Sequence, residues 1–318
     1  MKRFFLILTA ILLIFSCSRK DKVGETPKHR LGEIPEIRHI DMPTEVKKES
    51  NELKVSLLIS HRFFQLEENQ SNQKFVALIE KAQKNGEFLT FYFKEGTNKI
   101  VRVEEISEED KKMLERASIP ITKVNSNLQS IVPDEATLNK LFEEIKTQTC
   151  SFDKKYPCIS FDYPEDGCYA RAHKMKQFLA QKGYDCEKQF IYGNLRIRYD
   201  GITPERGGCC VNWSYHTSVL VSYRDERGKV QKKILDPSIS KKGPLSVEEW
   251  EKACQNSSCG DVEITKSITV SSDIYARNIN GDKVIYDPNY KNTDCVLQIF
   301  SRVFGCFLPV PSTVSCGF

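Results

Sequence analysis

Cys168 carries the clearest signs of a nucleophile in this chain of 318 residues. It follows Gly167, which permits a tight turn, and it opens a segment with helical spacing that ends before Gly183. Backbone N–H groups at the start of a helix stabilise a thiolate, and the cations of Arg171 and Lys174 follow about one turn later. The pattern predicts thiolate chemistry, although a structural disulfide is the common fate of a cysteine in such a sequence.

A thiolate that attacks a carbonyl carbon needs a histidine to carry protons. His173 lies on the same predicted helix as Cys168 but about 140° further round its axis, so we expect it on the solvated surface. His216 lies in NWSYHTSVLVSY, whose alternation predicts a strand. A strand histidine is commonly a structural hydrogen-bonding residue, so the assignment of His216 as base depends on its neighbour.

Asp236 is predicted to be that neighbour, across a β-hairpin. The strand that ends at Tyr223 is joined to KVQKKILD by the turn RDERG. If Tyr223 pairs with Lys229, His216 lies directly opposite Asp236, with Cβ atoms about 4.5–5.5 Å apart. A carboxylate there accepts the ring N–H of the histidine and fixes its tautomer. The alternative for Asp236 is an Asx turn before the following proline.

The surrounding elements predict an α+β domain. Apolar spacing predicts one helix that starts at Pro133 and Asp134 and another from about Cys168 to Lys182. Three strands follow, in FIYGNLRIRY, NWSYHTSVLVSY and KVQKKILD, and a short helix is predicted over Leu245–Gln255. The expected centre is an antiparallel sheet, with Cys168 at a helix N-terminus beside it.

The cysteines divide the chain into two parts. Eleven of the twelve lie between Cys150 and Cys316, and none lies between residues 18 and 149. A cysteine-rich unit suits an oxidising compartment, and because eleven is odd at least one of its thiols has no internal partner. The adjacent Cys209 and Cys210 compete with Cys168 for that role. The formal net charge of +4 is small and forms no basic stripe, so no nucleic-acid partner is expected.

Residues 1–17 are predicted to be a signal peptide. Two basic residues precede an apolar run from Phe4 to Phe15 that is too short to span a bilayer. IFSC, which ends at Cys17, looks like a bacterial lipobox. Two interpretations stay open, a lipid anchor on Cys17 or an ordinary signal peptide that contains a cysteine. Either way we expect an exported protein, a cell-envelope lipoprotein precursor or a secreted one.

The part before residue 128 is predicted to be a tether followed by a small module. Residues 18–51 are charged and poor in apolar side chains, which predicts a flexible tether. Residues 52–127 contain a predicted strand over Leu53–Leu66, a helix over Gln73–Gly86 and a strand over Phe88–Gly96, followed by a linker. This α+β module is small enough to be only marginally stable alone, so we expect it to dock on residues 128–318.

The sequence resembles known enzymes in two respects, the spacing of the three candidate residues and the local sequences around them. A helix-capping cysteine, a strand histidine 48 positions later and an aspartate 20 positions further resemble the core of transglutaminase-like, papain-related acyl-transfer enzymes. The local sequences resemble the bacterial protein-glutaminase family, secreted enzymes that deamidate glutamine in proteins. The similar segments are SIVPDEATLNKLF, DGCYARAHKM, GYDCEKQFIYGNL, CCVNWSYHTSVLVSY, ILDPS, SSCG and SCGF. A weaker likeness extends to KVSLLISHRFFQL.

The resemblance implies roles for three residues. Cys168 would be the nucleophile, His216 the base and acid, and Asp236 the orienting carboxylate. It also implies a zymogen whose pro-region covers the active site, five disulfides beside the free thiol, and cleavage by an activating protease just before Leu128. Within the pro-region we expect Ile59–Phe64 to be the inhibitory plug, with its aromatic pair in an apolar groove.

The expected function is hydrolytic deamidation of protein-bound glutamine through a cysteine thioester, without a metal or an organic cofactor. Its partners would be proteins or peptides with an exposed glutamine, the chain's own pro-region and an activating protease. Two other enzymes fit the same residues, a transglutaminase that cross-links proteins and a papain-like protease. A disulfide-rich envelope binding module without catalysis is the alternative from another class.

Overall fold

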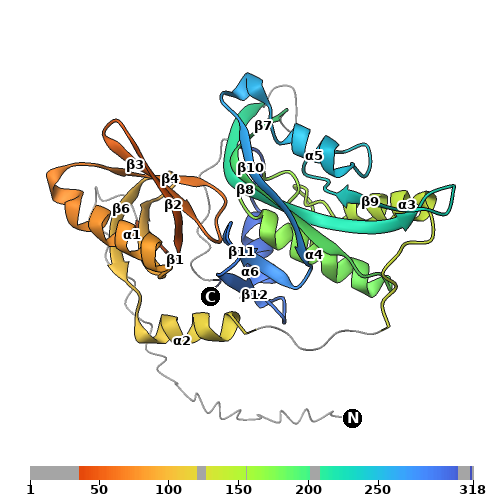
Figure 1. Ribbon diagram of the computed structural model, residues 1–318, viewed down its shortest axis with the longest axis horizontal. Helices are drawn as coiled ribbons and strands as arrows, with labels where there is room; N and C mark the ends of the chain where they lie inside the picture. The colour runs from red at the N-terminus through yellow and green to blue at the C-terminus, as the bar shows by residue number, and fades with distance from the viewer. Residues whose placement is uncertain (1–35, 120–126, 155, 201–207, 307–315, 317–318) are drawn as a thin grey trace, which may run out of the picture. The chain divides into compact units, whose positions relative to one another are not determined.

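The computed structural model describes residues 36–119, 127–154, 156–200, 208–306 and 316. Figure 1 shows the order of the helices and strands. We call residues 36–119 the N-terminal module and the remaining described residues the C-terminal unit; both belong to one compact unit that runs from Pro35 to Phe318. The predicted signal peptide, Cys17 and the first part of the predicted tether lie outside the described residues. No helix in the described ranges is long and apolar enough to cross a membrane.

A four-stranded antiparallel sheet forms the centre of the C-terminal unit, in the order β10-β7-β8-β9 (Figure 1). Its strands are β7 (Glu187–Tyr199), β8 (Cys209–Arg224), β9 (Val230–Leu235) and β10 (Glu263–Ser271). The three predicted strands are confirmed as β7, β8 and β9. The edge strand β10, whose residues alternate between exposed and half-buried, was not predicted.

Helices cover both faces of this sheet because alternate strand residues point to opposite sides. Phe190 and Val219 pack in one apolar cluster with Met175 of α4 (Cys168–Gln181). Ile191 and Leu220, one position further along each strand, pack in a second cluster with Trp250 of α5 (Val247–Ala253). The predicted helix at Asp134 is α3 (Glu135–Lys146), and the residues of its apolar face are all buried: Leu138, Leu141, Phe142 and Ile145.

Elements that were not predicted complete the unit. These are η2 (Ser257–Cys259), β11 (Ile274–Arg277), β12 (Val284–Tyr286) and α6 (Lys291–Phe300). The segment from β11 to α6 covers His173. The expectation that His173 lies on the surface is wrong: its Nε2 lies 3.1 Å from the carbonyl oxygen of Asp287 and its Nδ1 lies 2.9 Å from Nζ of Lys188. Burial lowers the pKa of His173 well below its usual value and lowers the pKa of Lys188 to about 7.

The N-terminal module contains two three-stranded antiparallel sheets. One has the order β1-β5-β6 and the other β2-β3-β4. Their strands are β1 (Glu36–Asp41), β2 (Pro43–Glu49), β3 (Glu52–Leu57), β4 (Phe63–Glu67), β5 (Leu89–Lys94) and β6 (Ile100–Glu105). The helices are η1 (Gln70–Asn72), α1 (Gln73–Asn85) and α2 (Glu108–Ala117). The module has its own apolar cluster, which includes Leu53, Phe64, Ile79 and Phe91.

Two predictions for this module need correction. The tether was expected to run to residue 51, but from Glu36 onward the chain forms β1, which pairs with β5, and β2, which pairs with β3. The single strand expected over Leu53–Leu66 is two strands, β3 and β4, separated by residues 58–62. The predicted helix is confirmed as α1, and Gly86 ends it in the left-handed conformation.

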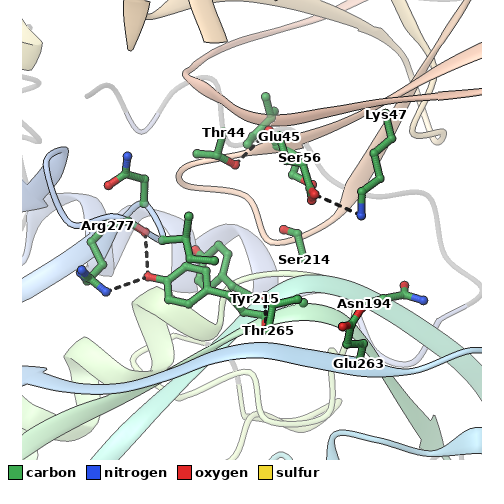
Figure 2. A pocket seen from close by; sticks show the side chains of 15 residues that line it. Thr44, Glu45, Lys47, Ser56, Asn194, Ser214, Tyr215, Glu263, Thr265 and Arg277 are labelled. Atoms are coloured by element: carbon green, nitrogen blue, oxygen red, sulfur yellow. Dashed lines mark hydrogen bonds and ion pairs between the residues drawn. The ribbon is translucent and has the colours of Figure 1, made fainter. Parts of the chain in front are cut away.

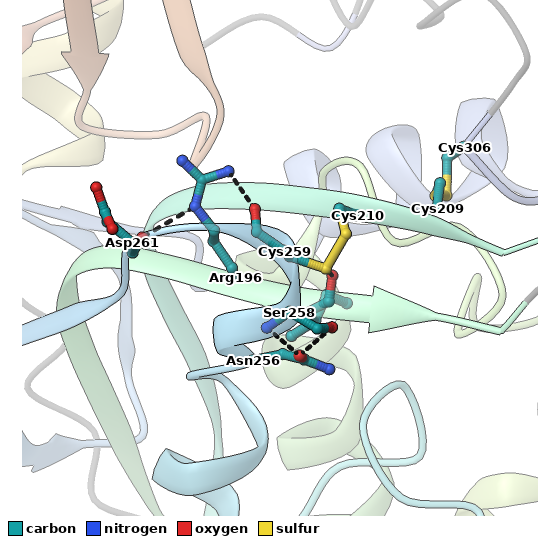
Figure 3. The surroundings of a disulfide bond; sticks show 9 residues. Arg196, Cys209, Cys210, Asn256, Ser258, Cys259, Asp261 and Cys306 are labelled. Carbon is teal, nitrogen blue, oxygen red and sulfur yellow. Dashed lines mark hydrogen bonds between the residues drawn. A yellow bond between two sulfur atoms is a disulfide. The ribbon is translucent and has the colours of Figure 1, made fainter.

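Four disulfides join cysteines within the described residues: Cys150–Cys158, Cys209–Cys306, Cys210–Cys259 and Cys295–Cys316. Figure 3 shows two of them starting from adjacent residues of β8. The expectation of five disulfides is therefore wrong. Three cysteines stay free and buried: Cys168, Cys186 and Cys254. Cys168 and Cys186 lie in the apolar cluster on one face of the central sheet, and Cys254 lies in the cluster on the other face.

Candidate active site

Cys168 is the first residue of α4 and is almost fully buried, with 1% of its surface exposed. Gly167 precedes it in the left-handed conformation, with φ of 89°, as the tight turn requires. Burial raises the pKa of the Cys168 thiol far above its usual value, although the cation of Arg171 and a hydrogen bond from the Thr217 backbone oppose the shift. The predicted thiolate is therefore a neutral thiol while this site is covered.

The turn before Cys168 depends on Gly167 for two reasons that can be separated. A Cβ atom added to Gly167 would lie 2.8 Å from the Phe300 ring, and the backbone there has a positive φ that residues with a side chain rarely adopt. Gly183, just after α4, has a similar φ of 87°, but a Cβ atom added there would have no other atom within 4 Å.

We expect Gly167→Ala to lower the free energy of unfolding by about 2–4 kcal/mol, the sum of backbone strain and overpacking. The matched variant Gly183→Ala introduces backbone strain without overpacking, so its free energy of unfolding should fall by only about 1–2 kcal/mol. Urea unfolding of both variants measures the difference. Equal losses would mean that Phe300 moves aside without penalty.

His216 and Asp236 lie together as predicted, although the two strands β8 and β9 pair in a register that differs from the predicted one. The structure pairs Tyr223 with Gln231 instead of Lys229, and Arg224 with Val230. Because side chains alternate with a period of two, this shift of two residues leaves both side chains on the same face. His216 Nε2 lies 2.8 Å from Asp236 Oδ2, so the ring N–H is donated to the carboxylate.

Asp236 is held by three further donors, on two residues, that the sequence analysis missed. Trp250 Nε1 donates to Oδ2 at 2.8 Å, the Ser238 backbone N–H donates to Oδ1 at 3.1 Å, and the Ser238 hydroxyl donates to the same Oδ1. Burial raises the pKa of Asp236, but its hydrogen bond with His216 and those from Ser238 and Trp250 outweigh burial, and the pKa lies below its usual value. The carboxylate therefore stays ionised. Nothing local to Trp250 in the sequence indicates that its helix packs over Asp236.

His216 keeps one ring nitrogen free and lies beside Cys168. His216 Nδ1 has no hydrogen-bond partner among the described residues. One ring nitrogen of His216, one of His61 and the Cys168 sulfur all lie within 4.8 Å of one another. Burial lowers the pKa of His216, while the hydrogen bond and charge of Asp236 oppose the shift. A neutral imidazole beside a thiol, with its far side fixed by a carboxylate, can accept the thiol proton.

His61 enters this site from the loop between β3 and β4, which we call the 58–62 loop. Its ring stacks on Trp213 with centroids 5.0 Å apart, and it is fully buried. The pairing of β7 with β8 skips Ser214, whose backbone N–H donates instead to the His61 carbonyl at 2.8 Å. Tyr215 donates its hydroxyl to the Ile59 carbonyl. The loop therefore lies along β8 as an added strand segment.

Asp166, just before the Gly167 turn, fixes the loop from the other side. Ser60 Oγ donates to Asp166 Oδ2 at 2.7 Å, and Arg62 Nε lies 3.3 Å from the same oxygen. Sequence analysis did not single out Asp166, although an acidic residue beside a candidate nucleophile is a signal that could have been weighed.

A second carboxylate shapes the 58–62 loop from within the N-terminal module. Asp41 is completely buried and accepts hydrogen bonds from the backbone N–H groups of Met42, Leu58, Ile59 and Ser60, at 2.8–3.3 Å. One buried side chain thus accepts from four backbone donors, of which only the Leu58 N–H also has a backbone acceptor, the Met42 carbonyl.

The aromatic pair expected to plug the site does not reach it. Phe64 is buried in the core of the N-terminal module, 4.4 Å from Phe93 between ring centroids, and Phe63 lies under the ammonium of Lys54. Beside the loop, a cavity of about 210 Å³ is lined by Thr44 and Ser56 on one side and Ser214 and Tyr215 on the other. Figure 2 shows these side chains facing each other across it.

Comparison with known proteins supports an enzyme at this site. Residues 138–254 match a family model described as glutaminase. No curated protein matches the chain. A crystal structure of pro-protein-glutaminase is 39% identical and covers 88% of this chain and 98% of its own, with a TM-score of 0.79.

Two further solved structures, both of shorter chains, cover a smaller share of this chain. A crystal structure of protein-glutaminase is 47% identical, covers 60% of this chain and 100% of its own, and has a TM-score of 0.55. The NMR structure of protein-glutaminase from Chryseobacterium proteolyticum has the same identity and coverage, with a TM-score of 0.53.

Proposed function

Since this chain belongs to the protein-glutaminase family, we propose that it hydrolyses the side-chain amide of glutamine in proteins, with Cys168 as nucleophile. The observation that carries the proposal is the arrangement of a buried thiol, a histidine with one free ring nitrogen and a carboxylate that fixes the other nitrogen. His216 is the base and acid, and Asp236 is the orienting residue.

The first half of the reaction forms a thioester and releases ammonia. His216 Nδ1 takes the proton of the Cys168 thiol, and the sulfur attacks the side-chain carbonyl carbon of glutamine. The resulting imidazolium gives this proton to the amide nitrogen, the C–N bond breaks and ammonia leaves. The negative charge of Asp236 stabilises the imidazolium, since it accepts a hydrogen bond from Nε2 throughout. The backbone N–H of Cys168, at the helix start, is a donor for the developing oxyanion.

The second half uses water. His216 Nδ1 takes a proton from a water molecule, whose oxygen attacks the thioester carbonyl, and the thiolate leaves and is reprotonated by the imidazolium. The product is a protein-bound glutamate, and the enzyme returns to its first state. In a transglutaminase a lysine amine replaces this water.

We assign the C-terminal unit to the transglutaminase-like, papain-related fold class. Its nucleophile is the first residue of α4, and its histidine and aspartate lie on and just after neighbouring antiparallel strands. This arrangement supports the proposed fold class.

The N-terminal module acts as an intramolecular inhibitor in this proposal. The 58–62 loop lies along β8 where an extended substrate would bind, and His61 occupies the space beside Cys168. Residues 128–318 form the catalytic domain, residues 36–119 most of the pro-domain, and an activating protease cuts the linker between them.

We also assign the precursor to export. Residues 1–17 would be the signal peptide, with Cys17 as a possible site of lipid attachment, and cleavage of the linker would release the catalytic domain from such an anchor. Incorporation of labelled fatty acid into the precursor, lost in Cys17→Ser, tests the anchor separately from the activity.

The activity is tested with a glutamine-containing protein such as casein, incubated with the chain after limited proteolysis. We expect ammonia in solution and a mass spectrum in which glutamines have become glutamates. Cross-linked multimers would instead indicate a transglutaminase, and cleaved backbones a protease. No chemical change in the substrate under any condition would favour a binding module.

Asp236→Asn should lower turnover by about a thousandfold to ten-thousandfold. The amide can present an N–H₂ to His216 Nε2, which places the proton on Nδ1 and leaves no base for Cys168. Trp250→Phe is the matched control, since it removes one donor to Asp236 and keeps the apolar ring. Ammonia release measures both, and near-normal turnover in Asp236→Asn would remove Asp236 from the mechanism.

A further inference from the structure

His61, Cys168 and His216 have the composition of a metal site, which the proposed reaction does not use. One ligand atom from each residue lies within 4.8 Å of the other two, and all three residues are buried. Two imidazoles and a thiolate are ligands that Zn²⁺ accepts readily.

A second observation concerns His61. Neither of its ring nitrogens makes a hydrogen bond of normal geometry among the described residues, although the side chain is fully buried and the Tyr215 backbone lies close to the ring. The carboxylate oxygen Oδ1 of Asp166 lies 3.6 Å from His61 Nε2, too far for a good hydrogen bond. Buried polar groups are normally satisfied, so a histidine with two unpaired nitrogens requires an explanation. We propose that His61, Cys168 and His216 together bind a zinc ion in the uncut precursor, which locks the 58–62 loop onto the nucleophile.

The three ligand atoms would have to move slightly closer together to bind a zinc ion. Zn–N bonds of about 2.0–2.1 Å and a Zn–S bond of about 2.3 Å place the ligand atoms of a tetrahedral site about 3.3–3.6 Å apart. The ring centroids of His61 and His216 are 6.2 Å apart, whereas two imidazoles on one tetrahedral ion have centroids about 5–6 Å apart. A shift of roughly 1 Å by the side chains closes the site.

The carboxylates that lie behind the two histidines are also suited to a metal site. His216 Nε2 is bonded to Asp236, so Nδ1 is left for the ion, and such carboxylate–histidine–metal arrangements orient the ring. If His61 binds through Nδ1, its Nε2 faces Asp166 in the same way. The fourth position is left for water or hydroxide.

Binding changes the proton and charge balance in a defined way. The Cys168 thiol loses its proton to solvent as the sulfur–zinc bond forms, so affinity rises with pH. Nearby charges, the carboxylates Asp166 and Asp236 and the cations Arg62 and Arg171, balance one another. The ion and the thiolate then add one positive charge, which a hydroxide in the fourth position neutralises.

The precursor alone has the complete site, because His61 belongs to the N-terminal module. Removal of one ligand should weaken binding by more than about 100-fold, since outer partners alone contribute about 10–100-fold. Zinc would thus hold the inhibitory loop in place until the linker is cut, and departure of His61 would release the ion from the active site.

The test uses Co²⁺ as a visible substitute for Zn²⁺, added to chelator-treated full-length precursor without substrate. We expect one equivalent to give a thiolate-to-cobalt charge-transfer band that Zn²⁺ abolishes. Cys168→Ala should remove the band, and His61→Ala and His61→Gln should weaken Co²⁺ binding by more than about 100-fold. Cys186→Ala, which removes a buried free thiol outside the three-residue site, should keep it. Circular dichroism of the metal-free variants confirms that each is folded.

Absence of the band in the wild-type precursor, or wild-type Co²⁺ affinity in both His61 variants, would overturn the proposal. Either result would mean that the two ring nitrogens are satisfied by water. Because no substrate is present, these outcomes are independent of the deamidation assay.

Discussion

Cys168→Ala abolishes ammonia release from protein substrates, a loss of at least about 10⁴-fold, because no other group can form the thioester. The fold should persist, since Cys168 is in no disulfide and its helix is anchored by buried residues such as Met175 and Leu179. Ammonia release and thermal unfolding of the cut protein measure the two effects. His216→Ala should have a comparable effect on turnover.

The other free thiols supply matched controls. Cys186 and Cys254 are buried like Cys168, and burial raises the pKa of Cys186 to about 12 and that of Cys254 well above its usual value. Neither belongs to the proposed mechanism, so Cys186→Ala and Cys254→Ala should retain activity. Ammonia release by Cys168→Ala at the wild-type rate would refute the nucleophile.

Cutting the linker between the N-terminal module and the C-terminal unit raises deamidation by at least about tenfold, because a tethered inhibitor acts at high local concentration and a released one does not. The freed module should then inhibit only when it is added back at high concentration. Uncut precursor that deamidates as fast as the cut form would contradict inhibition by the module.

Asp41→Asn tests the same mechanism without a cut. The amide leaves Asp41 with one acceptor oxygen for the four backbone donors of Met42, Leu58, Ile59 and Ser60, and each unpaired donor costs about 1–3 kcal/mol. Since each 1.4 kcal/mol changes an equilibrium tenfold, we expect the uncut variant to be at least about tenfold more active than the wild-type precursor.

Asp110→Asn is the control for that variant. It makes the same chemical change in the same module, where Asp110 pairs with Arg38 far from the 58–62 loop in sequence. It should leave the uncut precursor as inactive as the wild type. If both variants were equally active, the effect would be a general loosening of the module and not the support that Asp41 gives the loop.

Sequence patterns predicted those parts of the fold whose own residues determine them. The four apolar positions of α3 are buried because a 3.6-residue period places them on one face. The proximity of His216 and Asp236 survived an error in register, since a shift of two residues preserves the face. The error arose at the turn, where Asp225 accepts the backbone N–H groups of Arg227 and Lys229 and lets Arg224 pair with Val230.

What could not be predicted depends on partners distant in sequence. β1 and β2 are rich in charged residues and form strands because β5 and β3 offer free edges. His173 is buried by α6 and the β11–β12 hairpin, whose positions no local pattern indicates. The role of His61 depends on the unpaired N–H of Ser214, which exists only because the β7–β8 pairing skips that residue.

The neighbouring cysteines at the start of β8 also impose an order on biogenesis. Cys210 meets its partner Cys259 after 49 residues, whereas Cys209 has to wait 97 residues for Cys306. As the chain grows from its N-terminus, two adjacent thiols therefore compete for Cys259 before the second partner arrives. An early bond from Cys209 to Cys259 would be corrected only by thiol–disulfide exchange. Production of the native protein accordingly depends on a compartment that reshuffles disulfides as well as forming them.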